Sequence, residues 1–183
     1  MTDPSFTLFE TALGTCGILW SERGIRGVIL PEPTAEKTRQ RIGRRFPDAR
    51  QESPPPAVAQ AIEAIASLLA SGAGDLSGIA VNLEGVPQAD RDLYSVIRAL
   101  APVETLTYGE IAKRLGGAWT ARDVGAAMGR NPVPVIVPCH RVVAANGKLG
   151  GFSAPGGNDT KRRMLAIEQA VPRGHPDLFS VAR

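Results

Sequence analysis

The chain has little of several residue types, and each shortage excludes a class of protein. It contains two cysteines and two histidines among 183 residues. Two cysteines cannot form the disulfide framework of a small secreted domain, and they favour a reducing compartment. A structural zinc site needs four Cys or His ligands in paired spacings. The four available residues do not have those spacings, so no metal site is expected: Cys16, Cys139, His140 and His175.

Long apolar runs are also missing. No run approaches the roughly 20 residues of a membrane span, so a membrane is not an expected partner. The first residues, MTDPSFTLFE, lack the basic and then apolar layout of a secretion signal. Apolar residues nevertheless make up 43% of the chain, which is enough for the core of one large or two small globular domains.

Charge is modest overall but unevenly distributed. A net charge of +3 is compatible with an acidic partner such as nucleic acid, although it does not require one. Residues 37–50 carry a single acid, Asp48, and six basic residues: Lys37, Arg39, Arg41, Arg44, Arg45 and Arg50. The favoured interpretation of this segment is the solvated face of a surface helix.

Residues 1–85 read as a small α/β domain. Residues 6–30 alternate short Leu-, Ile-, Val- and Phe-rich runs with glycines, which predicts an antiparallel meander. A polar helix (TAEKTRQRIGRRF) follows, and ESPPPAV is a connector because proline cannot donate to a strand ladder. Residues 56–72 have a helical apolar spacing that ends at Gly72, and SGIAVNLEG is predicted to be one more strand.

From Gln88 to the end of the chain the pattern is mostly helical, and residues 86–183 are predicted to form a second domain. The segment QADRDLYSVIRAL has helical spacing. In TYGEIAKRLG, Thr107 and Glu110 form a capping-box pair, and in TARDVGAAMGRN, Thr120 and Asp123 form a looser version of it. Only GGAW separates these two segments, which is the layout of a helix-turn-helix, although such turns also occur in proteins that do not bind DNA.

The second of these helices presents unusually small side chains, among them Gly125, Ala126, Ala127 and Gly129. A helix that reads the major groove needs longer polar side chains to reach the base edges. A surface of small residues suits close approach to the minor groove, and it equally suits close packing against a neighbouring helix. The residues of this helix alone do not decide between the two.

Cys139 and His140 are adjacent, between a β-branched run and a glycine-rich segment. A nucleophilic cysteine needs a base or a cation, because a free thiol is mostly protonated at neutral pH. Pro138 disfavours a regular strand, so a turn or a bridging water could connect the pair. Glu168 shares a helical face with Lys161, Met164 and Leu165, and it is the best candidate to orient the histidine. A buried, inert cysteine is the alternative.

The segment NPVPVIVPCHRVV, with TYGEIA before it and GGFS after it, closely resembles the O6-alkylguanine-DNA alkyltransferases, also called methylated-DNA–protein-cysteine methyltransferases. The resemblance covers roughly residues 88–170. It implies a ribonuclease-H-like α/β domain with a small antiparallel sheet, followed by a mostly α, winged-helix-like domain with a helix-turn-helix. It also implies direct-reversal DNA repair, in which an alkyl group moves irreversibly from O6-alkylguanine, and from O4-alkylthymine, to the protein's own Cys139. No cofactor is expected.

The resemblance also assigns roles to individual residues. Cys139 is the nucleophile, His140 the base acting through a water, Glu168 the residue that orients His140, and Tyr108 the proton donor to guanine N3. Arg122 is the finger that fills the space left by the flipped nucleotide. Further DNA contacts are expected at Thr107, Ala126, Ala127 and Gly129. The pocket for the flipped base is expected to involve Met128, Asn131, Pro134, Val142, Phe152, Ser153 and Lys161.

The implied partner is double-stranded DNA carrying O6-alkylguanine, bound in the minor groove by a monomer that can bind cooperatively. The implied location is the cytoplasm, at the nucleoid in a prokaryote. This sequence departs from the family pattern at Asp123, where a small residue is usual, and in FSAPGGNDTK, which is longer than the common loop.

Two other classes of protein compete with this interpretation. A cysteine hydrolase could use Cys139, His140 and Glu168, but it would need an oxyanion hole and would leave Arg122 unexplained. A non-catalytic sensor of DNA damage would have no use for the cysteine.

Overall fold

The computed structural model describes residues 3–116, 118–145 and 148–170. Two residues named in the sequence analysis lie outside these ranges: His175, considered as a metal ligand, and Gly117 of the predicted turn. The chain forms two compact units. The first ends at Gly85 and also includes Pro132–Ile136, and the second comprises Val86–Asn131 and the described residues from Val137 onward. The short segment Pro132–Ile136, which the sequence analysis had assigned to the second domain, therefore packs with the first unit.

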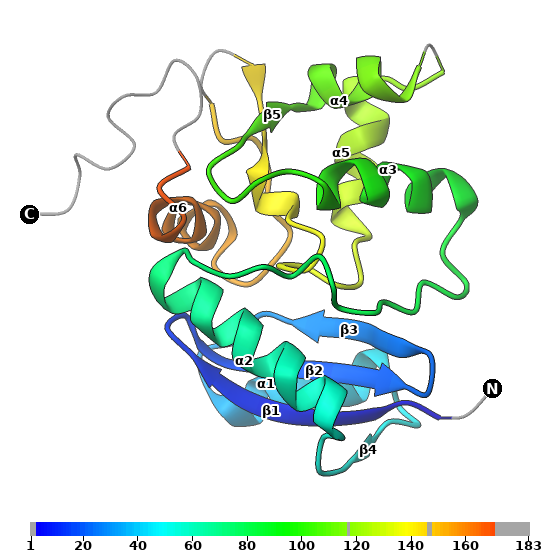
Figure 1. The fold of residues 1–183 in the computed structure, drawn as a ribbon, viewed down its shortest axis with the longest axis vertical. Helices are drawn as coiled ribbons and strands as arrows, with labels where there is room; N and C mark the ends of the chain where they lie inside the picture. The colour runs from blue at the N-terminus through cyan, green and yellow to red at the C-terminus, as the bar shows by residue number, and fades with distance from the viewer. Residues whose placement is uncertain (1–2, 117, 146–147, 171–183) are drawn as a thin grey trace, which may run out of the picture. The chain divides into compact units, whose positions relative to one another are not determined.

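A four-stranded sheet forms the centre of the first unit (Figure 1). Its strands are β1 (Ser5–Thr11), β2 (Gly14–Ser21), β3 (Gly24–Ile29) and the two-residue β4 (Arg50–Gln51), in the spatial order β3-β2-β1-β4. The first three strands are antiparallel, which confirms the predicted meander. β4 pairs in parallel with β1, so the sheet is mixed and the prediction of a purely antiparallel sheet is wrong.

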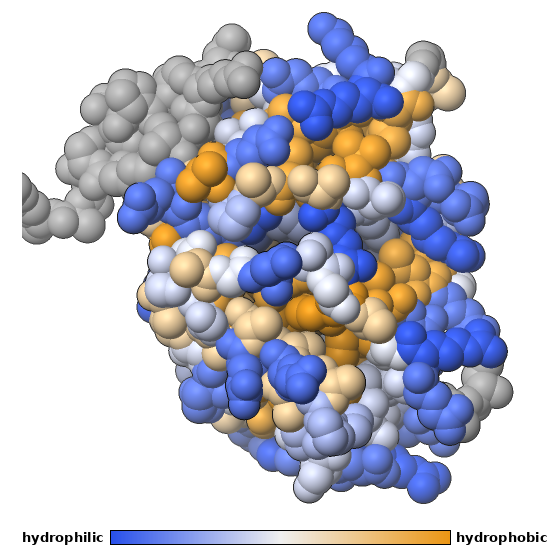
Figure 2. Space-filling model, viewed as in Figure 1, coloured by the Kyte–Doolittle hydropathy of each residue, from blue (hydrophilic) through white to orange (hydrophobic). Residues whose placement is uncertain are grey.

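Two helices cover this sheet, and Figure 1 shows α2 (Pro56–Ser71) in front of it and α1 (Ala35–Arg45) behind it. α2 begins with a proline at its first position, where the missing N–H costs no helical hydrogen bond, and it ends at Gly72 in the left-handed conformation. α1 packs through Ile42, which joins Phe6, Leu19 and Ile29 in one apolar cluster. On the α2 side, Figure 2 shows residues of intermediate hydropathy between the hydrophilic ones.

The predicted strand SGIAVNLEG is wrong. Within it, only Val81 makes a bridge, to Ile25 of β3, and turns lie at residues 77–78 and 84–85 on either side. Glycines at both ends of this stretch limit regular pairing. Two backbone bonds join it to the edge of β3: the Ile25 amide donates to the Ala80 carbonyl at 2.9 Å, and the Asn82 amide donates to the Ile25 carbonyl at 2.8 Å.

The second unit is mainly helical, as predicted. It contains α3 (Gln88–Arg98), α4 (Tyr108–Leu115), α5 (Ala121–Gly129), the single 3₁₀ turn η1 (Cys139–Arg141) and α6 (Gly157–Ile167). Two very short strands, β5 (Leu106–Thr107) and β6 (Val142–Val143), pair in parallel. Its core includes Val143, Leu149, Leu165 and Ala170. Within the described ranges, no helix has both the length and the hydropathy to span a membrane.

Candidate functional site

The pairing of β5 with β6 brings two distant parts of the second unit together. Leu106 pairs with Val142 and Thr107 with Val143. β5 leads directly into α4, whose first residue is Tyr108, and β6 directly follows the turn that carries Cys139. A short ladder of backbone hydrogen bonds therefore couples the expected proton donor to the expected nucleophile.

The predicted capping box at the start of α4 is confirmed. The Glu110 amide donates to Thr107 Oγ1 at 3.1 Å, and the Thr107 amide donates to Glu110 Oε2 at 2.7 Å. Satisfying these backbone groups fixes the first turn of the helix, and the first turn carries Tyr108. Thr107 thus has a clear local role in positioning the tyrosine.

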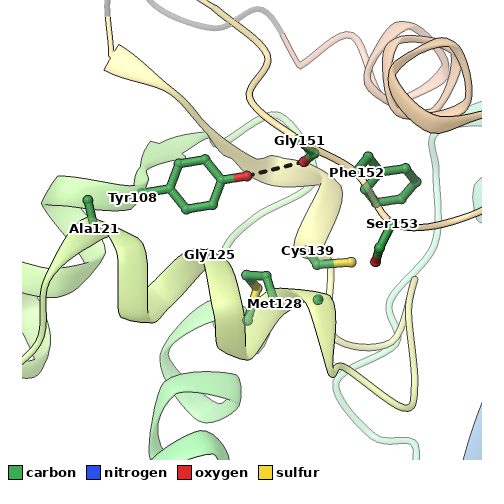
Figure 3. Close-up of a pocket in the computed structure, with 9 residues that line it drawn as sticks. Tyr108, Ala121, Gly125, Met128, Cys139, Gly151, Phe152 and Ser153 are labelled. Carbon is green, nitrogen blue, oxygen red and sulfur yellow. Dashed lines mark hydrogen bonds between the residues drawn. The ribbon is translucent and has the colours of Figure 1, made fainter.

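A cavity of about 460 Å³ opens beside Cys139 (Figure 3). Figure 3 shows the Cys139 sulfur on the side of its turn that faces Ser153. α5 contributes small residues to the wall, which leaves the space wide. The lining residues are Tyr108, Ala121, Gly125, Met128, Gly129, Cys139, Gly151, Phe152 and Ser153. Six of the expected site residues therefore meet at one cavity. Four are expected DNA-contact or pocket residues, Met128, Gly129, Phe152 and Ser153, and two are expected catalytic residues, Tyr108 and Cys139.

The loop opposite α5 requires glycine at position 150. Gly150 has φ of +73°, and a Cβ placed on it would lie 2.8 Å from the Tyr108 ring. Any side chain would therefore be strained and would push the ring away. The close approach also lets the Tyr108 hydroxyl donate to the Gly151 carbonyl at 3.3 Å. The loop holds the tyrosine at the edge of the cavity.

The Cys139 thiol is almost completely buried, with 8% of the residue exposed. Burial raises its pKa, and a hydrogen bond from Asn131 and the nearby Lys161 ammonium act in the opposite direction. Asn131 is itself held in place, because its Nδ2 donates to the Val137 carbonyl at 2.9 Å. The thiol thus sits among groups that stabilise its anion, inside a site that otherwise disfavours charge.

His140 and Glu168 form the predicted pair. His140 Nε2 lies 3.0 Å from Glu168 Oε1, and both side chains are buried. Burial alone would raise the pKa of Glu168, but hydrogen bonds from His140 and Arg141 outweigh it and hold that pKa below its usual value. Burial lowers the pKa of His140, so the ring is neutral and places its proton on Nε2, toward the carboxylate.

The second ring nitrogen of His140 is then an acceptor. Nδ1 is buried and has no hydrogen-bond partner among the described residues. Cys139 and His140 are consecutive residues of a 3₁₀ turn, which has three residues per turn, so their side chains point in different directions. A proton moving from the thiol to Nδ1 therefore needs a bridging group.

Arg141 is a site residue that the sequence analysis missed. Its Nε donates to Glu168 Oε2 at 2.7 Å, its Nη2 to Glu168 Oε1 at 2.9 Å, and its Nη1 to the Leu100 carbonyl at 2.7 Å. A charged residue that is 5% exposed requires such partners. The signal in the sequence was an arginine inside the apolar run VIVPCHRVV, where no solvated position is available.

Lys161 lies on the predicted face of α6 and is fully buried. Its Nζ donates to the Val142 carbonyl at 2.6 Å and lies 5.7 Å from the centre of the Tyr108 ring and 6.0 Å from that of Phe152. Burial lowers its pKa to about 8. Below that pH, a cation faces the aromatic wall of the cavity close to the thiol.

α5 presents Arg122 and Ala126 to solvent. Its start is a full capping box and not a loose one, because the Thr120 amide donates to Asp123 Oδ2 at 2.9 Å and the Asp123 amide donates to Thr120 Oγ1 at 3.2 Å. These hydrogen bonds from Thr120 lower the pKa of Asp123. The unusual acid beside Arg122 is therefore explained by helix capping.

One of the expected site residues is not where the resemblance implied. Ala127 is fully buried and its carbonyl accepts from the Tyr94 hydroxyl at 2.8 Å, so the predicted contact of its side chain with DNA is wrong. The helical period turns Ala127 inward while it turns Ala126 outward. Pro134 belongs to the segment grouped with the first unit. Like Asn131, Val142 and Lys161, it is not among the residues that line the cavity, so its expected contact with the flipped base stays a prediction.

An ion pair that was not predicted from the sequence holds the C-terminal end of α5 against α3. Arg130, the residue after the helix, donates to both carboxylate oxygens of Asp90 at 3.0 Å, and Asp90 is 4% exposed. The pair joins the end of α5 to the start of α3, directly before Asn131. Among the described residues, no group of three or more Cys, His, Asp or Glu side chains could hold a metal ion.

Comparison with known proteins gives a consistent result. Residues 88–170 match the family model for the DNA-binding domain of 6-O-methylguanine DNA methyltransferase. A methylated-DNA–protein-cysteine methyltransferase of Methanothermobacter thermautotrophicus is 30% identical over 152 residues, which are 83% of this chain and 78% of that protein. One from Methanosarcina acetivorans is 43% identical over 58% of this chain and 67% of its own length.

Solved structures agree with the sequence relatives. The Mycobacterium tuberculosis OGT in complex with DNA has a TM-score of 0.67 and 25% identity, with 96% of this chain and 99% of that chain covered. The O6-methylguanine-DNA methyltransferase of Pyrococcus kodakaraensis has a TM-score of 0.68 and 26% identity over 90% and 98% of the two chains. The chain belongs to the methylated-DNA–protein-cysteine methyltransferase family.

Proposed function

We propose that this protein repairs alkylated DNA by transferring the alkyl group of O6-alkylguanine, and of O4-alkylthymine, to the sulfur of Cys139. The observation that carries the proposal is the position of this thiol, which lines a cavity of about 460 Å³ beside buried, charged partners. The product is a thioether, which no group in the site can cleave, so each molecule acts once.

The reaction balances with the groups present. The Cys139 proton passes through a water to His140 Nδ1, and the resulting imidazolium is stabilised by Glu168. The sulfur then attacks the alkyl carbon, the bond from that carbon to O6 breaks, and its electron pair remains with the base. Tyr108 gives its proton to N3 of the leaving guanine. Burial raises the pKa of Tyr108, and the negative charge at Cys139 raises it further. The hydroxyl therefore holds this proton until the base accepts it.

Charge balance supports a thiolate at this position. With Lys161 and Arg141 positive and Glu168 negative, the buried cluster has one surplus positive charge while the thiol is protonated. Moving the Cys139 proton to His140 leaves this total charge unchanged, and the cluster becomes neutral when the imidazolium gives that proton up. Because an unbalanced charge is costly in a buried site, these partners favour the anionic form of the nucleophile over the form that burial alone would select.

DNA binding is assigned to α4 and α5 as a helix-turn-helix of winged-helix type, with α5 in the minor groove. The exposed Ala126 and Gly129 permit a close approach, and the exposed Arg122 is long enough to fill the space left by a flipped nucleotide. Flipping is necessary because a stacked base hides the alkyl carbon, and it costs a few kcal/mol. The flipped base would lie among Met128, Phe152 and Ser153, with Asn131, Val142 and Lys161 behind it.

For the first unit, we propose a ribonuclease-H-like fold. What supports it is the order β3-β2-β1-β4, with three antiparallel strands and a fourth that pairs in parallel with β1 after a helical connection. We further propose that the protein acts as a monomer in the cytoplasm, at the nucleoid in a prokaryote, and that several copies can bind cooperatively to one DNA. Two free cysteines suit such a reducing compartment.

One experiment separates this function from its competitors. The purified chain is incubated with a duplex that contains O6-methylguanine, and the mass of the intact protein is measured. We expect a gain of one methyl group, absent in Cys139→Ser. Repeated turnover of an ester without mass gain would indicate a cysteine hydrolase. Binding of the duplex with unchanged mass would indicate a sensor of damage.

A further inference from the structure

Helix α1 in the first unit is held in one fixed rotation. Only Thr38 and Ile42 are buried on it. The Thr38 hydroxyl donates to the Thr15 carbonyl at 3.1 Å and accepts from the Glu32 amide at 3.0 Å. Ile42 fits over Gly17, where a Cβ would lie 2.5 Å from Ile42 Cδ1. The rest of the helix surface must therefore face away from the sheet.

That outward surface concentrates positive charge in a unit that is otherwise acidic. Up to residue 85 the chain has eight basic and ten acidic residues, a net charge of −2. Five of the eight basic residues lie on α1, which carries one acid, Glu36. Helix α2, which covers the other face of the same sheet, has no basic residue. The basic residues on α1 are Lys37, Arg39, Arg41, Arg44 and Arg45.

Neighbouring acids neutralise only part of this surface. Arg41 pairs with Glu32 at 2.7 Å and Arg39 with Glu36 at 3.6 Å. The side chains of Lys37 and Arg44 have no ion-pair or hydrogen-bond partner in the described part of the chain. They lie seven residues apart, on one side of the helix and about 10 Å apart along its axis. Exposed cations at such a separation can contact two different phosphates.

We propose that this basic face, made of Lys37, Arg41, Arg44 and Arg45, is a second DNA-contacting surface that binds the phosphate backbone without regard to sequence. The inference rests on the proposed function, which brings the protein to DNA. Three of the four residues are arginines, whose planar guanidinium matches phosphate oxygens in pairs. Gln40 and Gly43, exposed between the cations, offer no apolar side chain for insertion into a lipid surface, which favours DNA over an anionic membrane.

The test compares two double variants that remove the same charge. Lys37→Gln with Arg44→Gln removes the two unpartnered cations. Arg23→Gln with Arg50→Gln removes two exposed cations elsewhere in the first unit, whose side chains are 74% and 76% exposed. Affinity for undamaged duplex DNA is measured over a range of salt concentrations. For the first variant we expect affinity to fall about tenfold at low salt and the salt slope to fall by about 1.8, since each lost phosphate contact removes about 0.9. The control should change less than about twofold.

Each alternative outcome has a definite meaning. Equal losses in both variants, or no loss in the first, would overturn the second surface. So would a first variant that retains its affinity for DNA but loses binding to vesicles of anionic lipid. Alkylation by free O6-benzylguanine should be unchanged in both variants, because neither pair touches the cavity. If the wild-type chain gains no alkyl group, the proposed function fails while the salt slopes still test the surface.

Discussion

The two cysteines of this chain occupy buried sites that differ in almost every other respect. Cys16 lies in the sheet of the first unit with no exposed surface, and the Thr11 hydroxyl is 3.6 Å from its sulfur. Burial raises its pKa to about 11. Cys139 is nearly as buried, yet it lines a cavity and has Asn131, His140 and Lys161 around it. Burial by itself raises the pKa of a thiol and makes it inert. A buried nucleophile also needs a cavity that admits the substrate and neighbouring groups that stabilise the thiolate.

The largest expected effect separates the two thiols directly. Cys139→Ser should abolish the mass gain with O6-methylguanine duplex, because a serine hydroxyl does not ionise in this site. Cys16→Ala should retain the full gain and lose about 1 kcal/mol of unfolding free energy to the small cavity. Intact-protein mass and urea unfolding measure both. A mass gain in Cys139→Ser would transfer the reaction to another residue.

The next effect concerns the charged partners that only Cys139 has. Glu168→Gln leaves Arg141 as a buried cation without its carboxylate, and it replaces the anion that orients and stabilises His140 with a neutral amide. We expect the repair rate to fall on the order of 10³-fold and the unfolding free energy by about 3–5 kcal/mol. At the other thiol, Thr11→Val should cost about 1 kcal/mol and leave repair intact. Single-turnover rates and urea unfolding test this, and a Glu168→Gln protein with normal rates would remove the carboxylate from the mechanism.

Access to the thiol should also be separable from its chemistry. Arg122→Ala should slow repair in duplex DNA about 100-fold, since about 2.7 kcal/mol of help with base flipping is lost. Its reaction with free O6-benzylguanine should change less than about threefold, because a free base needs no flipping. Arg162→Ala, which removes another exposed arginine of the same unit, is the matched control. Equal losses on both substrates would mean that Arg122 supports the fold and not the flipped state.

The smallest effect concerns the ammonium beside Cys139. Lys161 favours the thiolate while it is charged, so Lys161→Met should raise the pKa of Cys139 and slow alkylation about tenfold at pH 7. In the wild type, the rate should rise with pH and then level off above about pH 8, where Lys161 loses its proton. The variant should rise without levelling off there. Iodoacetamide labelling of Cys16 should be the same in both. Parallel pH profiles would contradict the assignment.

Local chemistry was well predicted from the sequence. The pairs Thr107 with Glu110 and Thr120 with Asp123 are three residues apart, so their hydrogen bonds depend on one turn of helix and little else. Helical periodicity was also enough to predict that Lys161 and Glu168 share the face turned toward Cys139. That prediction is confirmed by the contact of Glu168 with His140 across 28 residues.

Long-range pairings were predicted less well. Arg141 and the Asp90–Arg130 pair were missed. Each arginine is far from its carboxylate in the sequence, and only the folded chain brings the two groups together. The strand SGIAVNLEG was wrong since its bonding depends on the edge of β3. Ala127 was misassigned because small residues on a helix do not reveal which face is buried. In the structure its face packs inward, where its carbonyl accepts from the Tyr94 hydroxyl.

The isolation of Cys16 has a practical consequence. Because the other thiol, Cys16, is buried in the sheet, every alkyl group taken from a lesion should be found on Cys139. The fraction of chains that have become heavier would then count damaged bases one for one, and the protein could serve as a molecular dosimeter for alkylating agents without any engineering of its cysteines.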